Sequence, residues 1–585
     1  MIATRVPGVV LLADHFLMNR YHLLSPLLLG ALSLPLYSAA QSPGIQQEQL
    51  QRERERVLRE TLEQAPDVLT LGLPPPASTS LDYPEDEQAC SRIDTIIMEG
   101  DSAERFRPAL GTVMKAAGDG GAAGRCLGSQ GLQILLARVQ ADIIARGYTT
   151  TRVLAQPQDL STGRLILTVI PGRLRKVRMA EGADTRGNAV TALPLSEGDL
   201  LDLRAIEQGL ENLRRVPTAE ADIEITPSEE SDAQAGDSDL AVQYRQAFPF
   251  RVSASLDDGG ARTTGRYQAG VTVAYDNWWT LNDLFYASLT RSLGRYGDRG
   301  SRSHTVHYSL PFGYWLLSAT LSGSRYHQTV EGAFEPVVYS GHAETSEVKL
   351  SRLLRRNATS KSHVAARLLL RKSFNFVDQI PLAPQQRKMT AWEWSVNHRH
   401  FIGPAVAEIN LSHRRALDRQ GRAPEEELDL PQITTRYGLW LADAAIHAPF
   451  TLGTARLRYN ATARAQWNRG KLPAQDQFAI GGRYTVRGFD GDMNLQAERG
   501  WLLRNELSWE MGEGGQEVYA GVDTGAVAGP MTQSLSGRRL SGAVLGWRGN
   551  VNELRMELFL ATPLNRPQGF PTGTLTGGFS LQWWY

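Results

Sequence analysis

The sequence predicts a mostly β protein: a transmembrane β-barrel of about 16 strands, preceded by one polar helix and two small α+β modules. Three observations support this fold class. From Phe248 onward the chain carries short alternating runs separated by turns, and no segment shows helical periodicity. In the clearest runs, apolar side chains alternate with charged ones. Before Phe248, two stretches of similar length repeat a strand and helix pattern, judged by pattern and not by identity.

The N-terminal residues 1–40 are predicted to be a cleaved export signal. Met18, the expected start, opens a short basic segment, and residues 23–37 form an apolar run. The small residues 38–40 suit a cleavage site before Gln41. A helical membrane anchor is the alternative, but the apolar run is short for a membrane span.

Composition bears on partners and on chemistry. The chain has 62 basic and 62 acidic residues, and this balance gives no indication of a nucleic-acid partner. Cys90 and Cys126 are its two cysteines, and an even number in an exported chain points to a disulfide. Two thiols without a nearby histidine pair fall short of four metal ligands, so we expect neither a metal nor a cofactor.

Residues 41–65 contain a predicted polar helix. Residues 46–64 are good helix formers with Glu/Arg pairs at helical spacing and only a thin apolar stripe. Such a helix suits either a solvated surface or a water-filled pore, and the pattern does not choose between them. Residues 66–88 form a proline-rich linker that is expected to be extended and semi-rigid.

Two α+β modules follow, at residues 89–173 and 174–247. In the first, an amphipathic helix at 132–144 is followed by Gly147, a natural C-cap. Its strands are expected at 93–98, 150–156 and 164–170. In the second, we expect a strand at 174–181, a helix at 202–215 and strands at 221–227 and 238–245.

Residues 248–585 form the predicted barrel. In residues 452–467, every second side chain from Ala455 onward is apolar or aromatic and the alternate positions are polar, which suits lipid outside and water inside. Residues 501–511 repeat this pattern. The arginines of the predicted polar lining are Arg456, Arg458, Arg464 and Arg504. The last residue is the aromatic Tyr585. A large soluble β-sandwich is the alternative for this region.

A long insertion, residues 468–498, separates two of the clearest runs. Loops longer than about 15 residues are usually functional or disordered. Its centre reads Val486, Arg487, Gly488 and Phe489, which places one cation between apolar side chains beside a flexible glycine. Such a tip can direct a guanidinium to a carboxylate, and a solvated surface arginine is the alternative.

In this order of parts the chain resembles the outer-membrane transporters of two-partner secretion. This is the TpsB or haemolysin-activator family of ShlB, FhaC and HecB, with CdiB-type members among the candidates. The resemblance covers the whole mature chain. It implies that the modules are polypeptide-transport-associated (POTRA) domains in the periplasm and that the polar helix plugs a 16-stranded barrel in the outer membrane. It also implies that the 468–498 loop, between strands eleven and twelve, folds into the lumen.

The resemblance also supplies a partner for Arg487. In the family, the loop arginine pairs with an aspartate on strand thirteen in a Gly-x-Asp-x-Gly setting, which Gly521, Asp523 and Gly525 match. Alternation places Asp523 on the lumen side, and the two glycines leave room for the loop. A wet lumen would screen the pair, so we expect a contact worth about 1–3 kcal/mol. The family's first POTRA domain can carry a disulfide, and Tyr585 resembles the family's signal for barrel assembly.

The implied function is export of a large unfolded TpsA-type exoprotein. Its N-terminal secretion domain would dock on the POTRA domains by strand addition or in a helix-edge groove. The plug would then leave, and the cargo would thread the lumen. No nucleotide-binding loop is present in the sequence, and no enzymatic activity is expected.

Other expected partners are outer-membrane lipids, the barrel assembly machinery and periplasmic chaperones, with the protein itself a monomer. The cargo is left open among an adhesin, a haemolysin and a contact-dependent inhibition toxin, with the last two favoured. An assembly factor that inserts other barrels is the main alternative function, and a passive or ligand-gated pore is another.

Overall fold

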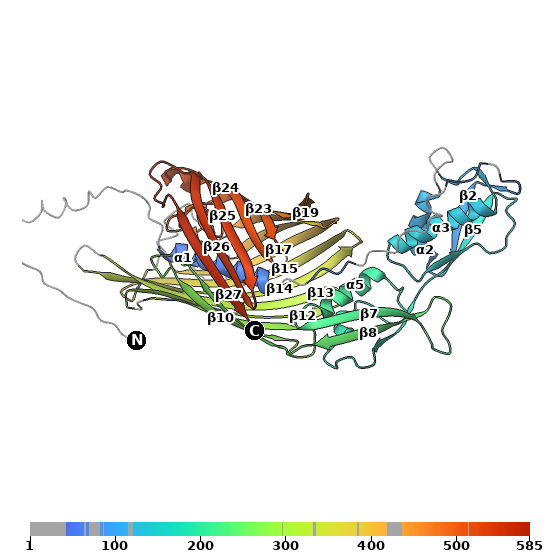
Figure 1. Cartoon of the computed structure of the whole chain (residues 1–585), viewed down its shortest axis with the longest axis horizontal. Coiled ribbons are helices and arrows are strands. Elements are labelled where there is room, and N and C mark those ends of the chain that lie inside the picture. The colour runs from blue at the N-terminus through green and yellow to red at the C-terminus, as the bar shows by residue number, and fades with distance from the viewer. Residues whose placement is uncertain are drawn as a thin grey trace, which may run out of the picture. The chain divides into compact units, whose positions relative to one another are not determined.

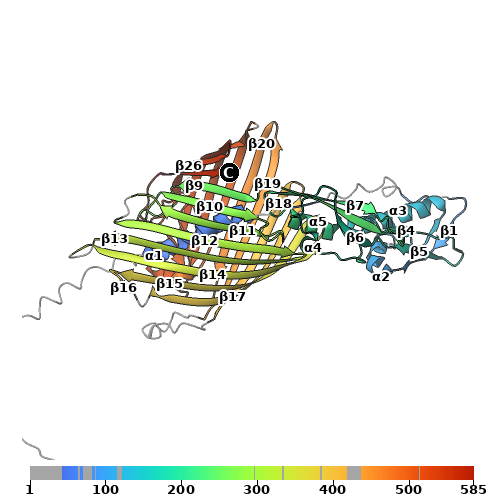
Figure 2. The ribbon, with the colours of Figure 1, turned by 90° about the horizontal axis from the view of Figure 1, so that it is seen from below.

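The computed structural model describes residues 43–63, 66–69, 82–85, 87–114, 121–294, 297–331, 335–382, 385–417, 436–512 and 514–585. The predicted export signal at 1–40 and most of the predicted linker lie outside these residues. Figures 1 and 2 show a closed ring of strands with the helix α1 (Pro43–Leu62, blue) inside it.

Long antiparallel strands close into a 16-stranded barrel, so the predicted fold class is confirmed. Each strand pairs with its neighbour along the chain, and β27 pairs with β9 to close the ring. The wall strands are β9 (Phe250–Asp257), β10 (Gln268–Asp276), β11 (Leu284–Ser292), β12 (Arg299–Phe312), β13 (Trp315–Val330), β14 (Val337–Arg356), β15 (Ser360–Val377), β17 (Arg387–Ile402), β18 (Ala405–Leu417), β19 (Gly438–Leu452), β20 (Ala455–Trp467), β23 (Arg499–Met511), β24 (Gln516–Ala528), β25 (Arg539–Val551), β26 (Leu554–Asn565) and β27 (Thr576–Trp584).

Alternation along each strand separates an apolar outside from a polar inside. On β13, for example, Trp315, Leu317 and Leu321 are exposed, whereas Thr320 and Tyr326 are buried on the inner face. Successive strand residues point to opposite faces, so this period-two pattern turns one face toward lipid and the other toward the lumen. We call the end where β9 begins and β27 ends the proximal end, and the opposite end the distal end.

The 468–498 loop joins β20 to β23, the eleventh and twelfth strands of the wall, at the distal end. It contains the 3-10 turn η5 (Ala474–Asp476) and the paired short strands β21 (Phe478–Ile480) and β22 (Leu495–Ala497). A second 3-10 turn, η6 (Pro530–Ser534), follows β24. Two-residue β16 (Ile380–Pro381) turns back to pair antiparallel with the end of β15.

The first module packs α3 (Ser129–Ala145) against a three-stranded sheet of order β2-β5-β4. Its strands are β2 (Thr95–Gly100), β4 (Arg152–Leu154) and β5 (Arg164–Ile170), and its other elements are α2 (Ala103–Phe106), η2 (Arg107–Thr112), β1 (Ser91–Ile93) and β3 (Arg125–Leu127). β4 is shorter than the predicted 150–156 strand. The Gln140 side chain bonds both the Thr151 carbonyl (2.8 Å) and the Val153 amide (3.0 Å), so a side chain replaces part of the ladder at this edge.

The second module has a sheet of order β6-β8-β7, covered by α5 (Leu203–Leu213). The Asp202 side chain caps α5 by accepting from the Arg204 amide (2.8 Å). The remaining elements are β6 (Leu174–Met179), α4 (Ala189–Ala192), β7 (Ala219–Pro227) and β8 (Ser238–Gln246). Every residue of α5 is buried, because its outer side packs on the proximal end of the barrel.

Candidate functional site

The tip of the 468–498 loop enters the barrel and delivers Arg487 to the wall. Asp523 of β24 accepts three hydrogen bonds from this residue, from the backbone N–H (3.0 Å), Nε (2.7 Å) and Nη2 (2.9 Å). Glu506 of β23 accepts a fourth from Nη1 (2.6 Å). A guanidinium fork that meets carboxylates in this way is fixed in orientation as well as in position.

This pair is buried, not bathed in water. Arg487 is 6% exposed and Asp523 is 0% exposed. Our expectation of a pair screened by a wet lumen is therefore wrong, because the loop itself covers the contact. Two further cations balance the carboxylates: Arg504 Nε lies 3.8 Å from Asp523, and Arg548 pairs with Glu506.

Apolar side chains on both sides of Arg487 seal the contact. Val486 is fully buried and Phe489 is 2% exposed, in a cluster that includes Leu540 of β25. Phe489 meets Phe570 edge to face, with ring centroids 5.8 Å apart. Burial of two such side chains contributes about 1.5–3 kcal/mol each to holding the loop in the lumen.

Glycines on the loop and on the wall permit this close approach. Gly488 has φ +107°, a conformation that side-chain-bearing residues rarely adopt. A Cβ on Gly521 would lie 2.8 Å from Arg487 Nη2, and one on Gly525 would lie 3.1 Å from Val486 Cγ2. The predicted room for the loop on β24 is thus present on the same face as Asp523.

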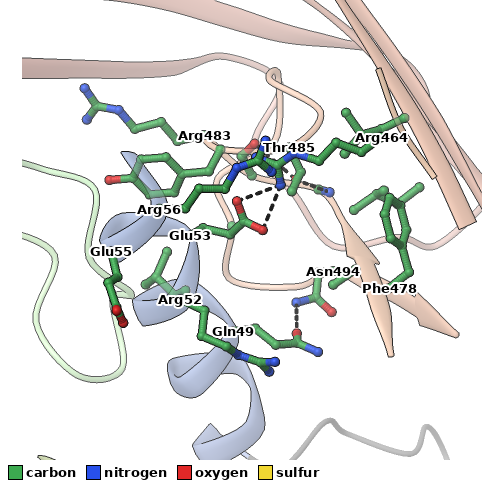
Figure 3. Close-up of a pocket in the computed structure, with 18 of the residues that line it drawn as sticks. Gln49, Arg52, Glu53, Glu55, Arg56, Arg464, Phe478, Arg483, Thr485 and Asn494 are labelled. Atoms are coloured by element: carbon green, nitrogen blue, oxygen red, sulfur yellow. Dashed lines mark hydrogen bonds and ion pairs between the residues drawn. The ribbon is translucent and has the colours of Figure 1, made fainter. Parts of the chain in front are cut away.

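The helix α1 lies along the lumen and touches the same loop. Gln46 donates to the carbonyls of Gly491 (2.6 Å) and Asp492 (2.9 Å). Gln49 donates to the Gln496 side chain (3.0 Å), and Asn494 donates to the Gln49 side chain (3.4 Å; Figure 3). The N-terminal half of the helix is therefore joined to the loop by hydrogen bonds.

Ion pairs join α1 to strands on all sides of the barrel. Arg54 meets Asp257 of β9 through two bonds of 2.9 Å, and Arg464 of β20 donates two bonds to Glu53 (2.8 and 2.7 Å; Figure 3). The other pairs are Arg59 with Glu347 of β14 (3.1 Å) and Arg56 with Asp443 of β19 (3.5 Å). Charges around its circumference explain why so polar a helix is stable inside the barrel.

Space remains beside the helix. A cavity of about 640 Å³ runs between α1, the loop and the wall, and its lining includes Arg52, Glu55, Arg367 and Arg483. Figure 3 shows Arg52 and Glu55 of the helix and Arg483 of the loop among the side chains that line this pocket. Charged side chains share this lining with apolar ones such as Leu369, Leu439 and Phe559.

The proximal end of α1 is held at the junction with the second module. Glu63 accepts from the Tyr286 hydroxyl (2.8 Å), and Leu62 and Val68 pack into the core that α5 shares with the barrel. Asp67 pairs with Lys361 of β15 and with Arg399 of β17.

The Val68 backbone is clamped between module and wall. Its amide donates to Glu211 of α5 (2.9 Å), and its carbonyl accepts from Arg356 of β14. We call Asp67, Glu211, Arg356 and Lys361 the junction clamp. Arg356 also bonds Glu207 of α5 (3.0 Å), so the same cation holds the linker and the module.

The four arginines predicted to line the barrel have different contacts in the structure. Arg464 binds α1, Arg504 lies beside the loop pair, and Arg458 pairs with Glu510 and Glu517. Arg456, near the proximal end, is exposed, and its side chain has no ion pair or hydrogen bond to the described residues.

Two other predicted positions are placed as follows. Cys90 and Cys126 form a disulfide that joins the start of β1 to β3 within the first module. Tyr585 extends the closing seam, because its amide donates to the Val252 carbonyl (2.9 Å) and its carbonyl accepts from the Val252 amide (3.2 Å).

Sequence reasoning missed several members of this site. Glu506 was expected on the polar face of its strand, but nothing marked it as the second partner of Arg487. No sequence pattern marked Asp257, Glu347 or the junction clamp as members of the site. The charge of α1 was the available hint, because a helix with that many arginines inside a barrel needs carboxylates on the wall.

The described residues contain no group of three or more histidine, cysteine or acidic side chains placed to hold a metal ion. None of the helices in the described part of the chain has the length and hydrophobicity to cross a membrane.

Comparison with known proteins adds three family matches. Residues 236–549 match the haemolysin secretion/activation protein family ShlB/FhaC/HecB. Residues 119–172 match a ShlB-type POTRA domain and residues 173–227 match a second POTRA domain.

Individual relatives agree with these matches. The chain is 34% identical to the outer membrane transporter CdiB-2 of Burkholderia pseudomallei (strain 1026b) over 93% of its own length and 94% of the relative's. It is 26% identical to the haemolysin transporter ShlB of Serratia marcescens, over 72% and 73% of the two chains. The solved structure of CdiB from Acinetobacter baumannii superimposes with a TM-score of 0.81 at 27% identity, over 94% of this chain and all of that one.

Proposed function

Because this chain belongs to the haemolysin secretion/activation family ShlB/FhaC/HecB and is a two-partner secretion translocator of the outer membrane, we propose that α1 is its resting plug and that the 468–498 loop is the element the plug rests on. The proximal end of the barrel faces the periplasm, where the POTRA domains lie, and the distal end faces outward. Relatives named as transporters favour this function over that of an assembly factor.

The contacts of α1 support the plug assignment. Its ion pairs reach β9, β14, β19 and β20, so the helix obstructs the lumen through which an unfolded chain would pass. Each pair is only partly buried and is worth about 1 kcal/mol or less. A plug held by several weak pairs is stable at rest and can still be displaced by a cargo that binds the POTRA domains.

Val486, Arg487, Gly488 and Phe489 form the anchor of the loop in this proposal, with Asp523, Gly521 and Gly525 as its seat. The buried Arg487–Asp523 pair keeps the loop on the wall while the plug leaves. Arg456, Arg458, Arg464 and Arg504 belong to the wall that a passing chain would meet. Tyr585 carries the barrel-assembly signal at the exposed proximal seam.

The proposed cargo is a large TpsA-type exoprotein, recognised through its N-terminal secretion domain by the POTRA modules at 89–173 and 174–247. The resemblance to CdiB-type transporters favours a contact-dependent inhibition toxin. Outer-membrane lipids surround the barrel, periplasmic chaperones and the barrel assembly machinery deliver it, and the protein acts as a monomer. The proposal gives it no enzymatic activity and no cofactor.

Single-channel conductance in planar bilayers tests the plug. The full mature chain is compared with a version that lacks residues 43–63. We expect brief, rare openings in the first and a steadily open channel in the second. Equal conductance in the two proteins would mean that α1 does not close the pore, and the plug assignment would be wrong.

A further inference from the structure

Three arginines stand side by side on the outer face of neighbouring strands. Arg291 of β11 is directly opposite Arg302 of β12, and Arg302 is directly opposite Arg325 of β13. All three are exposed. Directly opposite residues of an antiparallel pair have Cβ atoms about 4.5–5.5 Å apart, and like charges there are destabilising. An anion lying over the three strands would offset that repulsion.

Alternation fixes the side of the wall on which they lie. Tyr286 of β11 points inward to Glu63 of α1, and His307 of β12 points inward to the same carboxylate (3.3 Å). Arg291 and Arg302 are each an odd number of residues from these inward positions, so they face outward. They share neither the lumen nor the plug contacts of the site described above.

The position of the arginines along the strands gives their depth in the membrane. Arg302 is ten residues from Phe312 (312 − 302), and Arg325 is ten residues from Trp315 (325 − 315), on the same outer face. Phe312 and Trp315 are exposed at the proximal, periplasmic end. Ten residues span about 33 Å along a strand, or about 25 Å along the membrane normal at a tilt near 40°, which is the height of the apolar band.

The outer face between these levels is apolar. Val306 on β12 and Leu317 and Leu321 on β13 are exposed there, and Leu289 lies two residues below Arg291 on β11. The arginines therefore lie where the acyl chains of the outer leaflet end and its headgroups begin. A soluble anion would need only the charges, whereas a lipid would use the charges and the apolar columns beneath them.

Carboxylates are scarce on this part of the outer face. Within the described residues, neither Arg302 nor Arg325 forms an ion pair or a hydrogen bond through its guanidinium. Glu344 of β14 shares the face but is directly opposite Lys372 of β15, and Lys372 in turn is opposite Lys388 of β17. We call Arg291, Arg302, Arg325, Lys372 and Lys388 the outer basic patch.

We propose that the outer basic patch binds the phosphate groups of a phosphorylated glycolipid of the outer leaflet. Arginine forks match phosphate oxygens with two parallel hydrogen bonds, and several forks on adjacent strands can share one phosphate. The acyl chains lie along the exposed columns of β11, β12 and β13. Such a bound lipid fixes the height and orientation of this side of the barrel, away from the lumen and independent of plug movement.

Native mass spectrometry of the delipidated full chain, titrated with bisphosphorylated lipid A, tests the proposal. Replacing Arg302→Ser and Arg325→Ser together is expected to weaken binding by about tenfold or more, the effect of losing a charge-assisted contact of about 1.4 kcal/mol or more. The matched control is Arg352→Ser with Arg355→Ser, two exposed arginines at the proximal end of β14, which should change binding by less than about twofold. Heat-modifiable migration in gels verifies that each barrel is folded.

Further measurements separate the source of the phosphate. Dephosphorylated lipid A should bind the unaltered protein about as weakly as bisphosphorylated lipid A binds the double serine variant. An Arg302→Lys, Arg325→Lys variant keeps the charges and should bind more tightly than the double serine variant. Inorganic phosphate at roughly 10-fold excess over lipid A should leave most of the lipid bound, because free phosphate makes no contact with the apolar columns.

Equal binding by the double serine variant and the unaltered protein would overturn the proposal. So would an equal loss in the proximal control, or undiminished binding of dephosphorylated lipid A. Complete displacement by inorganic phosphate would show a site for a free anion, which also contradicts a lipid site.

Discussion

Asp523 accepts hydrogen bonds from both the backbone amide and the guanidinium of Arg487, and its side chain is fully buried by the loop that carries this arginine. One carboxylate thus fixes both the chain path and the side chain of the loop tip. The loop cannot leave the wall without exposing two charges and two large apolar side chains.

Replacing Asp523 should therefore be costly. Asp523→Ala leaves the buried Arg487 with Glu506 as its remaining close carboxylate, and we expect a loss of about 3–5 kcal/mol in the free energy of unfolding. Urea unfolding in lipid vesicles measures this loss. Asp443→Ala, which removes a more exposed carboxylate 3.5 Å from Arg56, is the control and should cost about 1 kcal/mol or less. Similar losses in the two variants would contradict a buried anchor.

Arg464 and Arg456 offer a matched pair on one strand for testing the plug. Both lie on the inner face of β20, but Arg464 binds Glu53 and Arg456 has no such contact to the described residues. Arg464→Ala should raise the open fraction of the channel about two- to fivefold, because it removes roughly 0.5–1 kcal/mol of plug contact. Arg456→Ala should leave the open fraction unchanged in the same bilayer recordings. An equal rise in both would point to wall charge in general and not to the plug.

The junction clamp should hold the linker whether or not the plug is seated. Glu211→Ala removes the acceptor of the buried Val68 amide. Hydrogen exchange at that amide should then accelerate by about tenfold, the effect of losing roughly 1–1.5 kcal/mol of protection. Glu220→Ala, an exposed carboxylate on β7 of the same module, serves as control. If the Val68 amide exchanged as fast in the unaltered protein as in the Glu211→Ala variant, the clamp would be ruled out.

The disulfide should stabilise the first module alone. It closes 36 residues, for which the chain-entropy model gives about 4 kcal/mol, with measured values typically about 2–4 kcal/mol. The Cys90→Ala, Cys126→Ala variant of the full chain should lose the first module to trypsin many times faster. The barrel fragment should stay intact, because the disulfide lies wholly within the module. Joint loss of module and barrel would mean that the two unfold together.

Glu63 predicts a pH dependence of plugging. Burial raises the pKa of its carboxyl, although Arg59 and the Tyr286 hydrogen bond act in the opposite direction. A raised pKa in the plugged state means that this state binds a proton more tightly than the open state, so lower pH should favour closure and higher pH opening.

Glu63→Gln mimics the protonated carboxyl and should reduce this pH dependence. Bilayer recordings between about pH 5 and 8 measure the open fraction, and Glu60→Gln, on the exposed side of the same helix, is the control. A pH response that is the same in the Glu63→Gln variant and the unaltered protein would exclude Glu63 as its source.

The architecture could be predicted from the sequence alone, because the patterns that indicate strands and helices are local. Alternation in Ala455–Trp467 needs only next-but-one neighbours, and it identified a strand with a polar inside and an apolar outside. The helix over Leu203–Leu213 likewise followed from the spacing of its apolar side chains, whereas the structure added its Asp202 cap. The pairing of Arg487 with Asp523 came from the family resemblance, since nothing local links residues that far apart.

Only the tertiary structure determined which side chains contact one another across the barrel. The wall partners of α1 are far from it in sequence, such as Asp257 for Arg54, and depend on the register in which sixteen strands close. Burial of the Arg487 pair, the second carboxylate of Glu506 and the junction clamp were invisible for the same reason. A sequence fixes which face of a strand a side chain occupies, whereas strand tilt and ring closure set which distant faces meet.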